Sequence, residues 1–242
     1  MRDTLFNKVL PEDYHFQFDN EVARVFDDML KRSIPYYQEI QRITVELAKY
    51  YYQESSVIYD IGCSTGNTLI RLAHAFRHNK IHIIGIDSSG SMIAQAREKL
   101  AHRHSMPMIE LLEKDCVEME FKRSSVVIML FTLQFIPPCL REKLLSKIYS
   151  TLHTDGIFIL SEKIISSSQD LNILYSKLYQ DFKRKNDYSE LEIKQKSLTL
   201  QNVLIPYTVE QNSALLKNAG FKKSDIFFKW NNFISFCAMK TG

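Results

Sequence analysis

The chain has 242 residues, of which 45% are hydrophobic and 24% are charged, and its formal net charge at pH 7 is +3. These values are typical of a soluble globular protein that is most simply one domain, and so small a charge gives no sign of a nucleic-acid footprint. No apolar run approaches the roughly 20 residues of a membrane span. We therefore expect no direct nucleic-acid partner and no membrane contact.

The distribution of cysteine and histidine is also informative. The four cysteines show no CxxC spacing, and residues 1–6 lack the apolar core of a signal peptide, so a reduced, cytoplasmic location is predicted. His74 and His78 are four positions apart, but their surroundings indicate an exposed helix face. We therefore predict no metal site.

Two amphipathic helices are expected before the first strand. The first is predicted at 20 to about 31, and the second, with Ser33 near its cap and Pro35 in its first turn, extends to about 52. Together with the N-terminal arm they make residues 1–55 a predicted helical lid within a single domain of residues 1–242.

The middle of the chain alternates between apolar strands and helices, which predicts a doubly wound, mostly parallel α/β sheet. Strands are expected at 56–60, 81–86, 108–112, 125–130 and 157–160. The intervening helices are expected at about 67–77, 89–103 and 138–153, with a turn at Asp155-Gly156 before the fifth strand.

The last third of the chain breaks this alternation. Residues 169–202 are predicted to form a helical insertion, with a break at Asn186-Asp187 between two helices and a solvated basic face at 183–185. A helix at about 208–218 and two strands at 225–230 and 233–240 follow, and their short connection predicts an antiparallel hairpin.

Residues 57–67 are the stretch around which this arrangement is built, since they read as a buried strand, a turn with Gly62 and Gly66, and a helix start. Asp87 ends the next strand, 25 positions after Gly62. This layout is typical of a nucleoside site in which the acid accepts hydrogen bonds from a ribose diol. In the alternative interpretation, the glycines serve only packing and Asp87 caps a helix or forms a turn.

Three further strand ends meet the same edge of the predicted sheet. Asp87-Ser88, Asp115-Cys116 and Leu130-Phe131 all lie at carboxyl ends, where open α/β sheets bind ligands. One ligand that touches all of them is the simplest interpretation, with Asp115 accepting from the amine of adenine. The sequence shows no nucleophile elbow, so no catalytic residue is assigned.

The glycine turn resembles the first motif of the class I S-adenosylmethionine-dependent methyltransferases, whose Rossmann-like fold also ends in an antiparallel hairpin. Nearly the whole chain further resembles the carboxy-S-adenosylmethionine synthases. The segments that carry this resemblance are 2–6, 32–37, 60–64, 131–135, 160–163 and 181–196. It implies a homodimer that moves a carboxylate from prephenate onto the methyl carbon of S-adenosylmethionine, for modification of the tRNA wobble uridine.

The resemblance also implies which residues form the site. The cofactor, S-adenosylmethionine or its carboxylated form, would be lined by Tyr37, Gly62, Cys63, Ser64, Asp87, Ser88, Asp115, Cys116 and the residue at position 130. Two positions depart from the family pattern, since Leu130 replaces an asparagine and Ser197 replaces the arginine that binds the added carboxylate.

These departures leave three hypotheses open. The chain is a synthase in which another cation, with Lys196 the first candidate, replaces the arginine. Alternatively, it is a methyltransferase that acts on an unknown small molecule. The third hypothesis is a cofactor-binding regulatory module without catalytic activity.

Overall fold

The computed structural model describes residues 1–11, 14–78, 80–101 and 107–242. Its helices are α1 (Asn20–Ser33), α2 (Tyr37–Tyr51), α3 (Asn67–Ala75), α4 (Gly90–Ala101), the short 3₁₀ helix η1 (Leu133–Phe135), α5 (Pro138–Thr151), α6 (Gln169–Lys185), α7 (Glu190–Thr199) and α8 (Val209–Asn218). Its strands are β1 (Val57–Ile61), β2 (His82–Asp87), β3 (Met108–Glu113), β4 (Ser124–Leu130), β5 (Leu152–Lys163), β6 (Lys223–Trp230) and β7 (Phe233–Met239).

The strands form one seven-stranded sheet in the order β3-β2-β1-β4-β5-β7-β6. The first five strands pair in parallel, whereas β7 pairs antiparallel with both β5 and β6. The order reverses between β1 and β4, which places a ligand crevice at their carboxyl ends. This confirms the predicted doubly wound sheet with its C-terminal hairpin.

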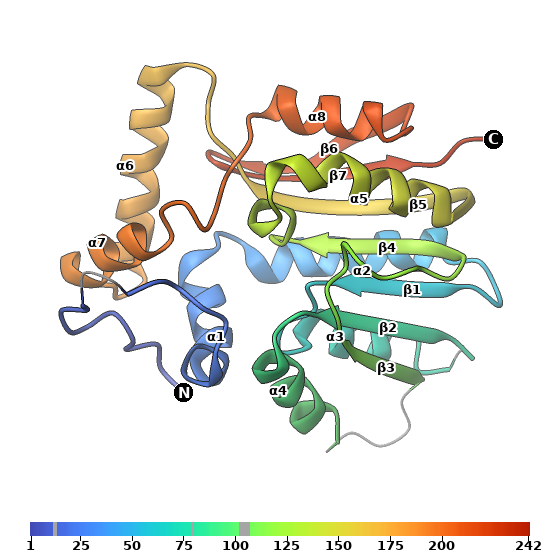
Figure 1. Ribbon diagram of the computed structural model, residues 1–242, viewed down its shortest axis with the longest axis horizontal. Coiled ribbons are helices and arrows are strands. Elements are labelled where there is room, and N and C mark those ends of the chain that lie inside the picture. The colour runs from blue at the N-terminus through green and yellow to red at the C-terminus, as the bar shows by residue number, and fades with distance from the viewer. Residues whose placement is uncertain (12–13, 79, 102–106) are drawn as a thin grey trace.

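Both faces of the sheet are covered by helices, as Figure 1 shows. Successive residues of a strand point to opposite faces, so Val127 and Met129 pack in the cluster with α5 and α8. Val126 and Ile128 pack in the other cluster, with α2 and α3. Burial on both faces explains why the central strand is apolar at successive positions.

The two N-terminal helices differ from the prediction at their junction. Ser33 closes α1 and does not cap α2, because Ile34 precedes Pro35 and is held in an extended conformation with φ −107° and ψ 114°. Pro35 lies in the turn, and Tyr36 has φ 55° directly before α2 begins at Tyr37.

These two helices also lie in different places. Most of α2 packs against α3 and across β4 and β5, so it belongs to a layer that covers the sheet. In contrast, α1 lies with α6 and α7 beyond the carboxyl ends of the parallel strands (Figure 1). We therefore propose a lid that consists only of the N-terminal arm, α1 and the first turn of α2, and not of all residues 1–55.

The insertion contains the predicted break. Helix α6 ends at Lys185, Asp187 has φ 62°, and α7 starts with a capping box between Ser189 and Glu192. However, the basic run at 183–185 is not a uniform solvated face, because Lys183 is only 6% exposed. The side chain of Lys183 lies on the inward face of α6, and the charged residues at 183–185 do not indicate by themselves which of them faces inward.

Some element boundaries also differ. The fifth strand begins at Leu152 rather than 157, because Asp155, predicted to be in a turn, donates its backbone N–H to Lys240 and joins the sheet at a bulge. Strand β6 begins at Lys223, two residues before the predicted start. The predicted end of the helix at 103 lies outside the described residues.

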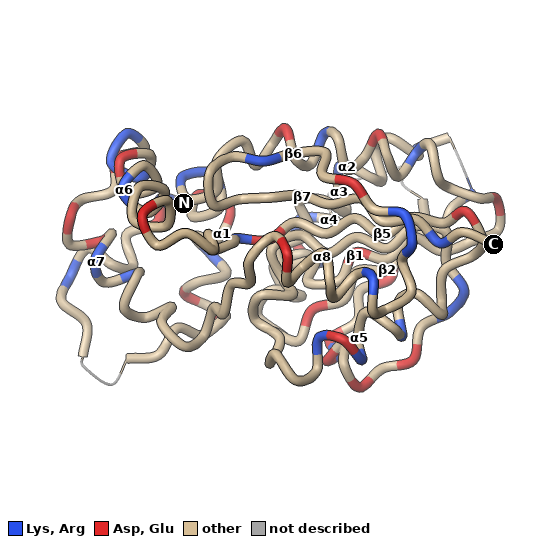
Figure 2. The backbone as a smooth tube through the Cα atoms, turned by 90° about the horizontal axis from the view of Figure 1, so that it is seen from above, with Lys and Arg blue, Asp and Glu red and all other residues tan. Residues whose placement is uncertain are grey.

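Charges of both signs are interspersed along the tube in Figure 2, on the sheet as well as around α6 and α7. In the described part of the chain, no helix combines the length and apolarity that crossing a membrane requires.

Candidate functional site

The turn after β1 requires glycine at position 62. Gly62 has φ +73° and donates its N–H to the carbonyl of Ile86 at 2.7 Å, which ties the turn to the neighbouring strand. A Cβ atom at this position would overlap the Thr132 side chain. Only glycine therefore fits both the backbone conformation and the space.

Asp87 holds this turn in place. Its Oδ2 accepts a hydrogen bond from the backbone N–H of Ser64 at 2.9 Å, and its Oδ1 accepts from the N–H of Ser89, also at 2.9 Å. Burial raises the pKa of this carboxyl group, whereas the two N–H donors oppose the rise. The carboxylate thus forms the turn before α4, where the Ser89 hydroxyl accepts from the N–H of Met92 as the helix cap, and it also faces the cavity.

Asp60, near the end of β1, is a site residue that the sequence analysis missed. It is 2% exposed, and its Oδ2 has no hydrogen-bond partner among the described residues. Burial, with the nearby charge of Asp87, raises its pKa to about 7. Such an unpaired buried carboxyl group is suited to accept the ammonium group of an amino-acid ligand.

A cavity of about 500 Å³ opens above these strand ends. It is lined by nine of the ten residues expected from the sequence, namely Tyr37, Gly62, Cys63, Ser64, Asp87, Ser88, Asp115, Cys116 and Leu130. These residues come from five places in the sequence, and the reversal of strand order brings them together. Ser197 is the exception, because its side chain is exposed on α7 and does not line this cavity.

Comparison with known proteins extends this result. A family model described as "Methyltransferase domain" matches residues 58–156. The chain is 44% identical over 240 residues to carboxy-S-adenosyl-L-methionine synthase of Nautilia profundicola, which covers 99% of this chain and 100% of that protein. The corresponding protein of Sulfurimonas denitrificans is 42% identical, with the same coverage.

The chain belongs to the carboxy-S-adenosyl-L-methionine synthase family. It is an S-adenosylmethionine-dependent transferase. Its fold is also that of human N-acetylserotonin methyltransferase, solved in complex with S-adenosylmethionine, with a TM-score of 0.55, 16% identity, and coverage of 96% of this chain and 61% of that one.

The family cofactor fits the polar groups at this end of the cavity. Asp60 lines it with a buried Oδ2 that has no hydrogen-bond partner among the described residues. Asp115 lines the same cavity, and its Oδ1 accepts from the N–H of Val117 at 2.8 Å. Its second oxygen has no partner among the bonds of the described residues, which suits an adenine amine.

The synthase fold also brings aromatic residues to the cavity from distant segments. Phe16 and Phe18 come from the N-terminal arm, Phe131 follows β4, Tyr179 lies on α6, and Phe233 begins β7. A continuous wall is formed by Tyr37, Phe131, Phe233 and Tyr179, because successive ring centroids lie 6.3, 6.0 and 5.1 Å apart. No local pattern indicates this wall, since its members are far apart in the chain.

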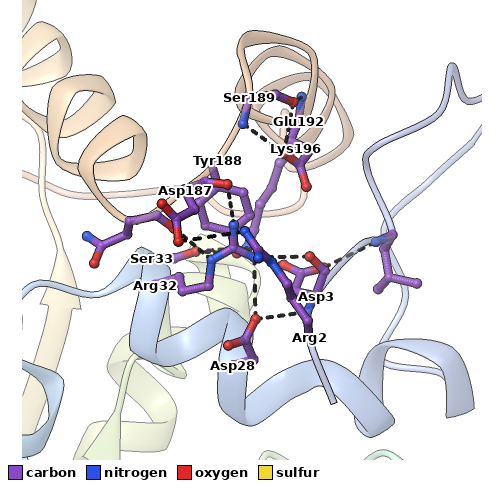
Figure 3. A network of polar contacts seen from close by, with 12 residues as sticks. Arg2, Asp3, Asp28, Arg32, Ser33, Asp187, Tyr188, Ser189, Glu192 and Lys196 are labelled. Atoms are coloured by element: carbon purple, nitrogen blue, oxygen red, sulfur yellow. Dashed lines mark hydrogen bonds and ion pairs between the residues drawn. The ribbon is translucent and has the colours of Figure 1, made fainter.

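Lys196, the first candidate to replace the missing arginine, lines the cavity but already has partners. Its Nζ donates to Ser33 Oγ at 2.9 Å and lies 3.7 Å from Asp3 Oδ2 (Figure 3). Burial lowers its pKa to about 7, although Asp3 opposes the shift. Its ammonium group is therefore committed to the contact between α7, α1 and the arm.

In the part of the chain that the structure describes, no group of three or more His, Cys, Asp or Glu residues is arranged to hold a metal ion.

Proposed function

We propose that this chain transfers a carboxyl group from prephenate to the methyl carbon of S-adenosylmethionine, and that the product serves tRNA wobble-uridine modification. The observation that carries the proposal is the similarity to named synthases over 99% of the chain, at 44% identity. The cavity is consistent with it, because one space joins a polar nucleoside end to an aromatic end that bears lysines.

The proposed reaction breaks one carbon–carbon bond and forms another. The bond between the prephenate ring and its carboxyl group breaks, and a new carbon–carbon bond forms at the methyl group, which gives up one proton. The ring becomes aromatic and expels its hydroxide, which takes that proton and leaves as water. The protein has to hold both reactants close together and shielded from water.

Residues of the strand ends would orient the cofactor. We assign the ribose to Asp87, the adenine amine to Asp115 and the ammonium group to Asp60, from the acceptors that each presents to the cavity. These three assignments, together with contacts from the other cavity residues predicted above, specify which positions of this chain would bind the family's cofactor.

A second candidate function is methyl transfer to a small molecule. Two replacements favour it, because Ser197 lacks the charge of the arginine that the family pattern has at this position, and Leu130 lacks the polar groups of the asparagine that it replaces. Overall similarity favours carboxyl transfer, so methyl transfer is the alternative outcome of the test below.

We further propose a cytoplasmic homodimer that makes no direct contact with nucleic acid. Support comes from exposed leucines at helical spacing on α6, at positions 171, 174 and 178, and from Leu191 and Leu198 on α7. Exposed apolar side chains gathered on two adjacent helices are typical of an interface. Sedimentation velocity of the protein, compared with a Leu174→Asp variant, tests the dimer.

The reaction is tested by incubating the protein with S-adenosylmethionine and prephenate and analysing the products by mass spectrometry. Carboxylated cofactor together with phenylpyruvate is expected. Formation of S-adenosylhomocysteine with a methylated acceptor, and no carboxylated cofactor, would instead establish methyl transfer.

A further inference from the structure

Two lysines contact the same tyrosine at the aromatic end of the cavity, and Lys183 is buried whereas Lys163 is half-buried. Lys163 is the last residue of β5, and Lys183 lies on α6. Their Nζ atoms are 5.0 and 4.6 Å from the centroid of the Tyr179 ring, which lies on α6 one helical turn before Lys183. Lys163 and Tyr179 line the cavity, and Lys183 is 6% exposed.

Neither ammonium group has a counter-ion in the part of the chain that the structure describes. Among the described residues, no carboxylate forms an ion pair with Lys163 or Lys183, and neither Nζ donates a hydrogen bond; the ring of Tyr179 is their shared contact. Burial lowers the pKa of Lys163. Burial, reinforced by the charge of Lys163, lowers the pKa of Lys183 to about 8.

Two like charges without a counter-ion are costly to bury, and an anionic ligand between them removes that cost. Lys196 differs in this respect, because Asp3 and Ser33 already contact its ammonium group. The lysines at 163 and 183 are therefore better placed than Lys196 to bind an added anion.

The backbone fixes where this pair lies. The N–H of Lys163 donates to Gln134 Oε1 at 2.9 Å, and Lys163 pairs with Phe233 in the sheet. Tyr179 packs against Phe233 with ring centroids 5.1 Å apart, and Phe233 contacts Phe131 in turn. An aromatic surface thus runs from the cofactor end of the cavity to the lysines, as a ligand with a ring and carboxylates requires.

We propose that Lys163 and Lys183, whose Nζ atoms both lie near the Tyr179 ring, form the subsite that binds the carboxylates of the carboxyl donor and of the carboxylated cofactor. The assignment rests on the proposed function. In it, these lysines bind the added carboxylate, which the family pattern assigns to an arginine. They act as specificity-determining residues that distinguish a ring-bearing di-acid from a neutral acceptor.

The test compares Lys163→Met, Lys183→Met and Lys183→Arg with wild type and with Lys185→Met, an exposed lysine on the same helix. Methionine keeps the length and the apolar stem, so the variants should fold, which thermal unfolding checks. Binding of prephenate and of S-adenosylmethionine is measured by calorimetry, and product formation by mass spectrometry.

Each methionine variant should bind prephenate about tenfold more weakly, or more, from the loss of one charge-assisted contact. Its affinity for S-adenosylmethionine should stay within about twofold of wild type, by the same reasoning. Lys183→Arg keeps the charge and should retain most of the binding, and Lys185→Met should match wild type.

The possible failures are distinguishable. Wild-type affinity for prephenate in both methionine variants would overturn the subsite, whether or not product forms. A second result is also informative. If the wild-type protein binds prephenate through these lysines but yields no carboxylated cofactor, the proposed reaction is wrong and the subsite remains.

Discussion

The hydroxyl of Tyr188 donates a hydrogen bond of 2.6 Å to Oδ2 of Asp3, which lies 185 positions earlier in the chain. Arg32 from α1 stacks on the same tyrosine, with its guanidinium carbon 3.9 Å from the ring centroid (Figure 3). The contact fastens the arm to the α6–α7 connection, and so closes the side of the cavity that carries Phe16 and Phe18.

Removal of this hydroxyl should destabilise the protein. In Tyr188→Phe the buried Asp3 carboxylate loses a donor, so we expect the free energy of unfolding to fall by about 1–3 kcal/mol. Urea unfolding measures the change. Tyr50→Phe is the control, because Tyr50 is 83% exposed and should behave like wild type. Equal stability of the two variants would show that the contact contributes nothing.

Asp87 should be required for cofactor binding. In Asp87→Ala the ribose loses an acceptor and the N–H of Ser64 loses its partner, so affinity for S-adenosylmethionine should fall by about 1–3 kcal/mol. Calorimetry gives the dissociation constant, and circular dichroism checks the fold. Unchanged affinity in a folded variant would remove Asp87 from the site.

Asp60 should make the stability of the ligand-free protein depend on pH. Its pKa is about 7 in the folded protein and near 4 in the unfolded chain, so the folded state holds a proton that the unfolded state releases. Stability should therefore fall as the pH rises from about 4 through about 7, by at most about 4 kcal/mol. Urea unfolding at several pH values measures this loss.

Asp60→Asn keeps the shape of the side chain and cannot ionise. The variant should therefore show a smaller loss of stability than wild type between pH 5 and pH 8. Parallel curves for the two proteins would mean that the Asp60 carboxyl group is already ionised at pH 5.

Residues 33–40 should become protected when the cofactor binds. Ser33, Ile34 and Tyr37 line the cavity, so a bound ligand should slow local opening of this junction. Hydrogen exchange with and without saturating S-adenosylmethionine tests this expectation, with β6, on the far edge of the sheet, as internal reference. Equal exchange at 33–40 in both states would argue against a lid at this junction.

Ser197→Arg should leave the preference for the carboxylated cofactor over S-adenosylmethionine unchanged. The side chain at this position is exposed and does not line the cavity of its own chain, whereas Lys163 of the proposed subsite does. The ratio of the two dissociation constants is the measurement. A ratio shifted toward the carboxylated form would show that position 197 reaches the cavity of a second copy.

The sequence alone determined the local parts of this protein. The strand, the Gly62 turn, the helix and Asp87 could be predicted because backbone conformation and strand-end chemistry depend on neighbouring residues. The break before α7 could be predicted for the same reason, and its capping box is formed within four consecutive residues.

Only the tertiary structure decided which of several similar residues face the cavity. Lys183 and Lys185 belong to one basic run, yet only the first is buried, because the contacts of α6 with α1, α7 and the β6–β7 hairpin set its orientation. Lys196 faces inward, and the adjacent Ser197 faces outward on α7. Asp60 acquires its raised pKa from burial between strands that the sequence separates. Such properties depend on long-range packing, which spacing along the chain does not encode.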